Sequence, residues 1–240
     1  MSNPNEPRRR SRLPFVIVGV VVVLAAIAAI VWFLVLPEDD DPVADLKESV
    51  GSGESVATDD LDGTWRIVAG SGDETTFAGY LVEEVFAQGA RHVTASGRST
   101  AVTGEATVSG GTVTAVSITV DTTELESDQG RRDNAIRSRG LETDRFPEAT
   151  FELTEPVELP TGMTDGNVSK ATVTGDLTLH GVTRSVTVPL DVRPLGDAFT
   201  VLARIPVDFA DYDIEAPSVG GFVEVEDNGQ IELRINFARG

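Results

Sequence analysis

The chain has 240 residues, a net charge of −20 and no cysteine. The lack of cysteine excludes disulfides, thiol nucleophiles and cysteine-ligated metals, and the negative charge argues against nucleic acid as a partner because it repels phosphate groups. With one apolar segment and one β-rich region, this length predicts a single folded domain behind a membrane segment.

An uncharged apolar run, Leu13 to Leu36, predicts a transmembrane helix. At the α-helical rise it reaches roughly 36 Å, enough to cross a hydrocarbon core about 30 Å thick. Four arginines lie in residues 1–12, and four acidic residues, 38–41, follow the run after Pro37. The positive-inside rule therefore predicts a single-pass protein of the cytoplasmic membrane, with a basic cytoplasmic tail over 1–12 and an extracytoplasmic C-terminal domain.

Two alternatives to this anchor are a cleaved signal peptide and a twin-arginine export signal. The run ends in Trp-Phe-Leu-Val-Leu-Pro rather than in a small-residue cleavage site, which favours retention. The arginine cluster matches the twin-arginine pattern poorly. The next segment, 37–60, is rich in Asp, Glu, Gly and Ser and has no sustained apolar period, so it predicts an acidic, flexible linker.

From residue 61 onward, most segments alternate apolar and polar residues, which predicts strands. The first are Trp65–Ile67 and Tyr80–Phe86. Strands over 98–109 and 112–121 flank Gly110-Gly111, a pair suited to the positive φ angles of a tight hairpin. Val113 and Ala115 have the opposite parity to Val116, Ile118 and Val120, so either a bulge shifts the register or both faces are buried there.

Residues 127–140 break the alternation and predict one short polar helix. Ser127 or Asp128 can cap its start, its arginines lie late, and Gly140 stands at its end.

Strand alternation resumes at Phe151 and Leu153 and is clearest over 172–190, where His180-Gly181 is the predicted turn between two arms. Further strands are expected over 199–207 and 231–237. About eight antiparallel strands with one helical insert predict an all-β fold, either a closed up-and-down barrel or a sandwich.

Three blocks of this sequence resemble the YceI-like, polyisoprenoid-binding family. They are Trp65-Arg66-Ile67, the block from Ser127 to Phe151, and Leu-Thr-Leu-His-Gly-Val-Thr-Arg from Leu177 to Arg184. The resemblance spans nearly all of 61–240 and implies a lipocalin-like antiparallel barrel that holds a long isoprenoid lipid. Two features depart from the family pattern: the strand over 78–85, and the apparent retention of the anchor in place of an export signal.

The resemblance implies an apolar, lipid-lined interior, for which small residues such as Ala101, Ala106, Ala115, Ala171, Gly175 and Ala203 could leave room. The residues expected to line it are Phe151, Leu153, Val173, Leu177, Leu179, Val186, Val188, Phe199, Val201, Ile205, Ile231 and Leu233. Each of them could instead belong to an ordinary packed core. The residues expected at a mouth or gate are Tyr80, Arg132, Phe146, Tyr212 and Phe222.

Two readings of Arg132 and its neighbours remain open. They could form a charged lip that meets a lipid head group, or they could complement the helix and form an internal salt bridge. His180, in the hairpin turn, is expected to bond to backbone rather than to a metal.

We expect no enzymatic activity, no metal and no cofactor other than a bound isoprenoid lipid or quinone, because no histidine pair or nucleophile elbow is present. The predicted function is binding of an isoprenoid lipid for storage, transport or protection. The alternative is a tethered β domain with a filled core that presents loops to an envelope protein. The sequence leaves a homodimer open.

Overall fold

The computed structural model describes residues 44–49, 51–57, 61–86, 91–219 and 223–240. The predicted cytoplasmic tail, the membrane span and the first part of the linker lie outside these ranges. Within them, no helix is both long and apolar enough to cross a bilayer.

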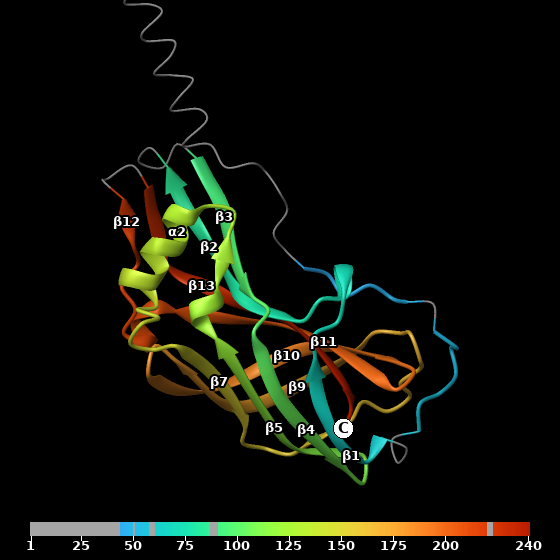
Figure 1. Ribbon diagram of the computed structural model, residues 1–240. Coiled ribbons are helices and arrows are strands. Elements are labelled where there is room, and N and C mark those ends of the chain that lie inside the picture. The colour runs from blue at the N-terminus through green and yellow to red at the C-terminus, as the bar shows by residue number, and fades with distance from the viewer. Residues whose placement is uncertain (1–43, 50, 58–60, 87–90, 220–222) are drawn as a thin grey trace, which may run out of the picture. The chain divides into compact units, whose positions relative to one another are not determined.

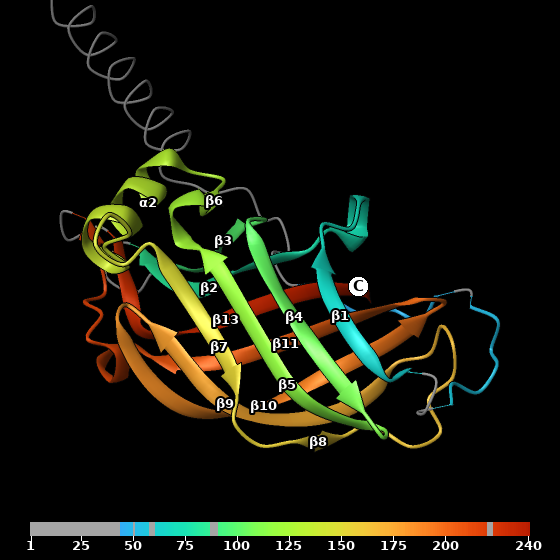
Figure 2. The ribbon, with the colours of Figure 1, turned by 60° about the horizontal axis from the view of Figure 1, so that its bottom comes forward.

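Eight antiparallel strands close into a barrel (Figures 1 and 2), so the structure decides for the barrel and against the sandwich. Each strand pairs with the next in the order given, and the last pairs back to the first. They are β1 (Gly63–Val68), β4 (Val102–Ser109), β5 (Thr112–Asp121), β7 (Glu148–Leu153), β9 (Ser169–Leu179), β10 (Val182–Leu195), β11 (Ala198–Asp208) and β13 (Val223–Arg239). Closure leaves each of these strands a neighbour on both sides.

Three more strands extend the barrel at one end: β2 (Phe77–Phe86), β3 (Arg91–Ser99) and β6 (Glu126–Ser127). The long strand β13 pairs with β1 near its C-terminal end and with β2 over its earlier part. The strand expected over 98–109 is therefore two strands, β3 against β2 and β4 against β1. Between them the Ser99 hydroxyl accepts from the Ala101 amide and donates to the Asp121 carbonyl, which interrupts the ladder.

Short elements complete the domain. They are the strands β8 (Val157–Glu158) and β12 (Ser218–Val219), and the 3₁₀ turns η2 (Gly72–Glu74), η4 (Thr122–Glu124) and η6 (Phe209–Tyr212).

Both predicted tight hairpins are present. Gly110 and Gly111 have φ angles of 58° and 73°, and His180 and Gly181 have 50° and 75°. Two successive positive φ angles match the right-handed twist of the flanking strands. A Cβ on Gly181 would lie 2.6 Å from the Phe146 ring, so the position also requires glycine for space.

The parity change in β5 is a bulge. The β4–β5 register shifts between Thr107 and Val108, which pair with Ala115 and Val113. Ala115 is exposed, so the alternative of two buried faces is wrong for that residue. The bulge turns Val113 toward the same interior as Val116.

The predicted helix is present as α2 (Gly130–Ala135) followed by a π-helical turn, η5 (Ile136–Gly140). Its N-cap is Gln129 rather than Ser127 or Asp128. The Ser127 hydroxyl instead donates to the Asp133 carboxylate at 2.6 Å, which ties the helix to β6.

The described part of the predicted linker, residues 44–49 and 51–57, is not a solvated tether. We call it the strap, because it lies against the outside of the barrel. Leu46 is buried beside Phe77 and Leu202, and Ser55 forms a β-bridge with Thr164.

Outward-facing arginines hold the strap in place. Arg193, Arg204 and Arg234 donate to the backbone oxygens of residues 47, 44 and 45, respectively. The strap is attached because these charged donors on the outer sheet face supply partners for its backbone.

Candidate functional site

The interior of the barrel contains an apolar cavity of about 150 Å³ that is partly open to the outside. Among the residues that line it, Glu158 alone carries a charge. The lining residues come from all eight barrel strands, β8 and the loops beside them: Leu61, Trp65, Ala106, Val108, Val113, Val116, Ile118, Phe151, Leu153, Val157, Glu158, Leu159, Pro160, Ala171, Val173, Val188, Leu190, Val192, Phe199, Val201, Ala203, Ile205, Leu233, Ile235 and Phe237. Such a site can exclude water and take an apolar ligand, but it offers little to a polar one.

Most of the predicted lining residues face this cavity: Phe151, Leu153, Val173, Val188, Phe199, Val201, Ile205 and Leu233. The other four, Leu177, Leu179, Val186 and Ile231, do not line the cavity and pack in a hydrophobic cluster that includes the buried Tyr212 and also some lining residues, among them Val188 and Ile205. These four have the expected inward parity, but side chains from η6 and the segment after η5 fill the space opposite them.

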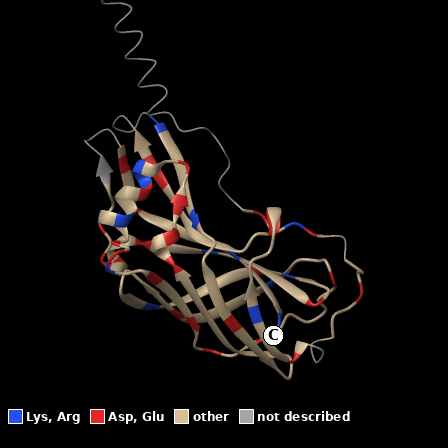
Figure 3. Ribbon diagram, viewed as in Figure 1, with Lys and Arg blue, Asp and Glu red and all other residues tan. Residues whose placement is uncertain are grey.

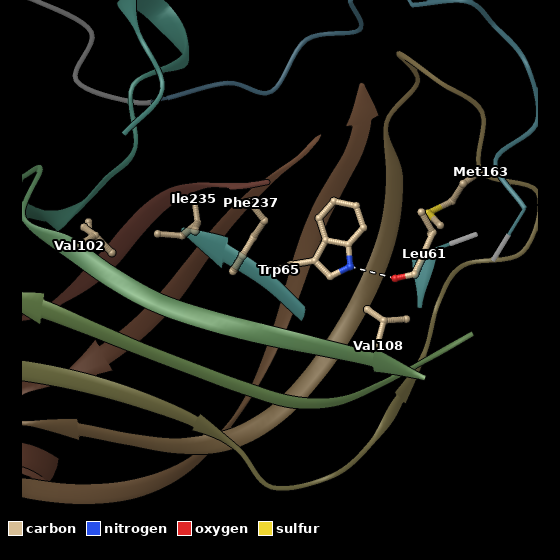
Figure 4. Close-up of a cluster of buried hydrophobic side chains, with 8 residues drawn as sticks. Leu61, Trp65, Val102, Val108, Met163, Ile235 and Phe237 are labelled. Atoms are coloured by element: carbon tan, nitrogen blue, oxygen red, sulfur yellow. Dashed lines mark hydrogen bonds between the residues drawn. The ribbon is translucent and has the colours of Figure 1, made fainter. Parts of the chain in front are cut away.

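A second cluster packs against the cavity near Trp65 (Figure 4). The indole nitrogen of Trp65 donates to the Leu61 backbone oxygen at 2.9 Å. The Trp65 ring meets the Phe199 ring edge to face, with centroids 4.7 Å apart. Met163, which is 1% exposed, packs in the same cluster. The hydrogen bond satisfies the buried indole N–H and orients the ring in the cavity wall.

Some of the small residues expected to leave space in the interior do line the cavity. Ala106, Ala171 and Ala203 line the cavity, whereas Ala101 and Ala115 do not. Gly175 acts indirectly: a Cβ there would lie 2.4 Å from the Phe151 ring, so the missing side chain gives that ring its place in the wall.

Several lining residues were not predicted. The inward parity of Ile118, Ile235 and Phe237 was a usable signal for them. Leu159 and Pro160 lie in a loop without periodicity, and no sequence pattern could have identified them.

Two of the expected gate residues, Tyr80 and Arg132, belong to a buried polar cluster apart from the cavity. The guanidinium Nε of Arg132 lies 2.7 Å from Glu84 Oε1, and Nη2 lies 3.1 Å from Oε2. Burial acts to lower the pKa of Arg132, but Glu84 and Asp128 outweigh it and the pKa is raised. Burial also raises the pKa of the Tyr80 phenol. The internal salt bridge considered for Arg132 is therefore present.

Two other expected gate residues, Phe146 and Tyr212, anchor loops. The Phe146 ring packs edge to face on His180, with ring centroids 4.4 Å apart. The Nδ1 atom of His180 lies 3.0 Å from the Tyr212 backbone oxygen, as expected of a histidine that bonds to backbone. Its Nε2 atom lies 3.3 Å from Glu142 Oε2. Phe222 lies outside the described residues.

In the described part of the chain, no three His, Asp or Glu side chains are arranged to hold a metal ion. The cavity is the candidate functional site, because its lining offers a continuous apolar surface suited to an apolar ligand.

Comparison of the sequence with known proteins finds relatives among the UPF0312 and YceI proteins. A UPF0312 protein of Vibrio parahaemolyticus is 34% identical over 120 residues, which cover 46% of this chain and 59% of that protein. Protein YceI of Shigella flexneri is 36% identical over 83 residues, covering 34% of this chain and 39% of that protein. The chain thus matches less than two thirds of the length of these curated relatives.

Solved structures share the fold. A polyisoprenoid binding domain from Saccharophagus degradans, implicated in plant cell wall breakdown, matches with a TM-score of 0.56 and 17% identity, over 73% of this chain and 98% of that one. Burkholderia cenocepacia BcnA matches with a TM-score of 0.50 and 20% identity, over 65% and 95%. The model of the YceI-like domain matches residues 75–237, which is more than half of the chain. The chain therefore belongs to the YceI-like domain family.

Proposed function

We propose that the barrel binds a polyisoprenoid-type lipid, such as an isoprenoid quinone or a carrier lipid, for storage, transport or protection. The observation that supports this most directly is the apolar cavity inside a closed barrel. Each buried methylene of a ligand contributes about 0.8 kcal/mol, so even a short enclosed segment of an isoprenoid chain is held usefully. The name of the Saccharophagus degradans domain, a polyisoprenoid binding domain with the same fold, supports the same ligand class.

The location that we propose is the outer side of the cytoplasmic membrane, with the N-terminus inside. The basic residues before the apolar run and the acidic residues after it support this orientation. The alternative function, an envelope scaffold with a filled core, is disfavoured because the interior holds a cavity.

The test is recovery of lipid from the full-length protein. The protein is purified from native membranes in detergent, extracted with organic solvent and analysed by mass spectrometry. We expect a prenyl lipid in the wild type and in Val68→Trp, because Val68 is 40% exposed and does not line the cavity. We expect its loss in Val173→Trp, because Val173 lines the cavity and the indole would fill it.

A melting curve shows whether Val173→Trp is folded. Recovery of equal lipid from the two variants, or of none from the wild type, would contradict the proposal.

A further inference from the structure

The cavity occupies only part of the apolar interior that the barrel strands surround. On three neighbouring strands, inward-facing apolar residues continue past the last residue that lines the cavity. They are Val186 on β10, Val207 on β11 and Ile231 on β13. All three pack in the hydrophobic cluster that includes Tyr212. The interior therefore continues toward η6, but there it is filled by side chains.

The side chains that fill this part come from connecting segments as well as from the barrel wall. Tyr212 and Phe209 belong to η6, Ile214 lies just after η6, and Leu141 lies just after η5. Tyr212 is 3% exposed, whereas the other three are half-buried. Because a packed core relaxes only partly when a large side chain is removed, part of the lost volume remains as a cavity. A smaller residue at 212 should therefore lengthen the cavity without changing a strand of the wall.

Hydrogen bonds hold Tyr212 in place at this end of the barrel. The Asp208 carboxylate accepts from the Ala210 amide at 3.1 Å, at the start of η6. Asp213 ends the turn in the left-handed conformation, with a φ of 53°. The backbone oxygen of Tyr212 lies 3.0 Å from Nδ1 of His180, in the β9–β10 hairpin. The turn that carries the tyrosine ring is thus fixed at both ends and tied to the barrel.

In the other direction the cavity extends toward the Gly110-Gly111 hairpin. By strand register, this hairpin lies level with the start of β11, whereas η6 follows the end of β11. Figure 2 shows the hairpin at the lower right and η6, in orange, at the left. Val108 and Val113, which flank the hairpin, line the cavity. A chain that lies along the cavity therefore has one end toward the hairpin and the other toward η6.

The η6 end of the barrel is a poor exit for a hydrocarbon tail. Asp208, Asp211 and Asp213 are exposed there, in a domain that carries acidic residues over much of its surface (Figure 3). A tail that passed beyond Tyr212 would enter water among these carboxylates, so the added length would gain no apolar burial.

We propose that Tyr212 sets the length of the prenyl chain that the barrel accepts. The end of the tail stops at the cluster that includes the tyrosine ring, and a smaller side chain at 212 admits a longer tail. This rests on the proposed lipid-binding function and adds to it a residue that determines specificity for tail length.

The test compares geraniol with farnesol, which is one isoprene unit longer. Calorimetry with full-length protein in nanodiscs of neutral lipid gives both affinities, and titration of empty nanodiscs corrects for partition into the lipid. In the wild type we expect the two affinities to differ by less than about threefold, because the added unit stays outside the cavity. In Tyr212→Ala the farnesol-to-geraniol ratio should be at least about tenfold higher than in the wild type, since each further buried methylene contributes about fourfold.

The control removes another aromatic ring at the same end of the barrel. Phe146 packs on His180 but belongs neither to the cluster nor to the cavity lining. Phe146→Ala should therefore loosen this end without raising the ratio. If the melting curve shows that Tyr212→Ala is unfolded, Tyr212→Leu takes its place and should raise the ratio at least about threefold.

The outcomes separate this inference from the proposed function. If neither prenol binds to the wild type, the proposed function fails. If both bind but the folded Tyr212 variant keeps the wild-type ratio, or Phe146→Ala raises it equally, lipid binding stands and the role of Tyr212 is wrong. A wild type that already prefers farnesol at least about tenfold would also overturn that role, because the tail would not stop at Tyr212.

Discussion

The Nη1 atom of Arg193 lies 2.7 Å from the backbone oxygen of Lys47, although the two residues are 146 positions apart. Arg193 is 2% exposed, and its Nη2 also bonds to Glu74 at 2.8 Å. This contact, together with those of Arg204 and Arg234, makes the strap part of the folded domain.

Replacing Arg193 should release the strap. Trypsin cleaves after lysine, and the peptide bond after Lys47 includes the oxygen that Arg193 holds. A hydrogen bond to a charged group contributes about 1.5–3 kcal/mol, so Arg193→Met should speed native-state cleavage at this bond at least about tenfold. Mass spectrometry of a time course measures the rate. Arg145→Met, at a 73% exposed side chain, is the control. Equal rates of cleavage after Lys47 in the two variants would mean that contacts other than that of Arg193 hold the strap.

The Arg132–Glu84 pair should be costly to break from one side. Arg132→Met leaves the buried Glu84 carboxylate without its main partner, and we expect a loss of about 3–5 kcal/mol in the free energy of unfolding. The double variant Arg132→Met with Glu84→Leu should recover most of that loss. The exposed neighbour serves as control, and Arg131→Met should change stability by about 0.5 kcal/mol or less. Urea denaturation measures all three. An Arg132→Met variant as stable as the wild type would contradict this account.

Gly175 should tolerate no side chain. In Gly175→Ala the new methyl would lie 2.4 Å from the Phe151 ring and 2.5 Å from the Glu152 backbone oxygen. We expect a loss of about 1–3 kcal/mol in stability from overpacking, and weaker lipid binding as the ring moves into the cavity. Gly130→Ala, where the added carbon meets open space, is the matched control and should not destabilise the fold. Thermal unfolding and calorimetry decide between these outcomes.

Acid should loosen one end of the strap through Asp165. Its carboxylate accepts hydrogen bonds from the Ser52 amide at 2.6 Å and the Gly196 amide at 2.7 Å. These bonds hold the pKa of Asp165 below its usual value. The attachment is therefore complete above the usual pKa of an aspartate and is lost as pH falls through the lowered folded value.

Hydrogen exchange at the Ser52 amide should show this loss of protection in the acid range, after correction for the intrinsic rate. Asp165→Asn should show weakened protection already at neutral pH. An exchange profile identical in the two proteins would refute the role of this carboxylate.

The affinity of the barrel for a prenyl lipid should increase with the length of the lipid's isoprenoid tail only up to a limit. An apolar cavity of about 150 Å³ accommodates a ligand about the size of benzene, and the cavity here has that volume. Across prenols of increasing length, affinity should rise at first and then level off beyond about five to ten carbons, one or two isoprene units, because the remaining chain stays outside the cavity. Calorimetry over the series measures this. A steady rise to much longer chains would mean that the barrel widens around its ligand.

The β9–β10 hairpin shows how far the sequence alone reached. The alternation over 172–190 and the turn at His180-Gly181 determined two strands, their register and their inward faces, because a strand has only two faces and a tight turn only a few conformations. The same reasoning placed Val173 and Val188 in the interior, where they line the cavity.

Only the tertiary structure decided which interior positions face a cavity and which face packed neighbours. Val173 and Leu177 share one face of β9, yet the first lines the cavity and the second packs with Tyr212 from a distant turn. Composition likewise predicted a free linker over 37–60, because the arginines that hold the strap lie more than 140 positions away. Local patterns determine which way a side chain points, but what it meets there depends on segments that the fold brings from elsewhere in the chain.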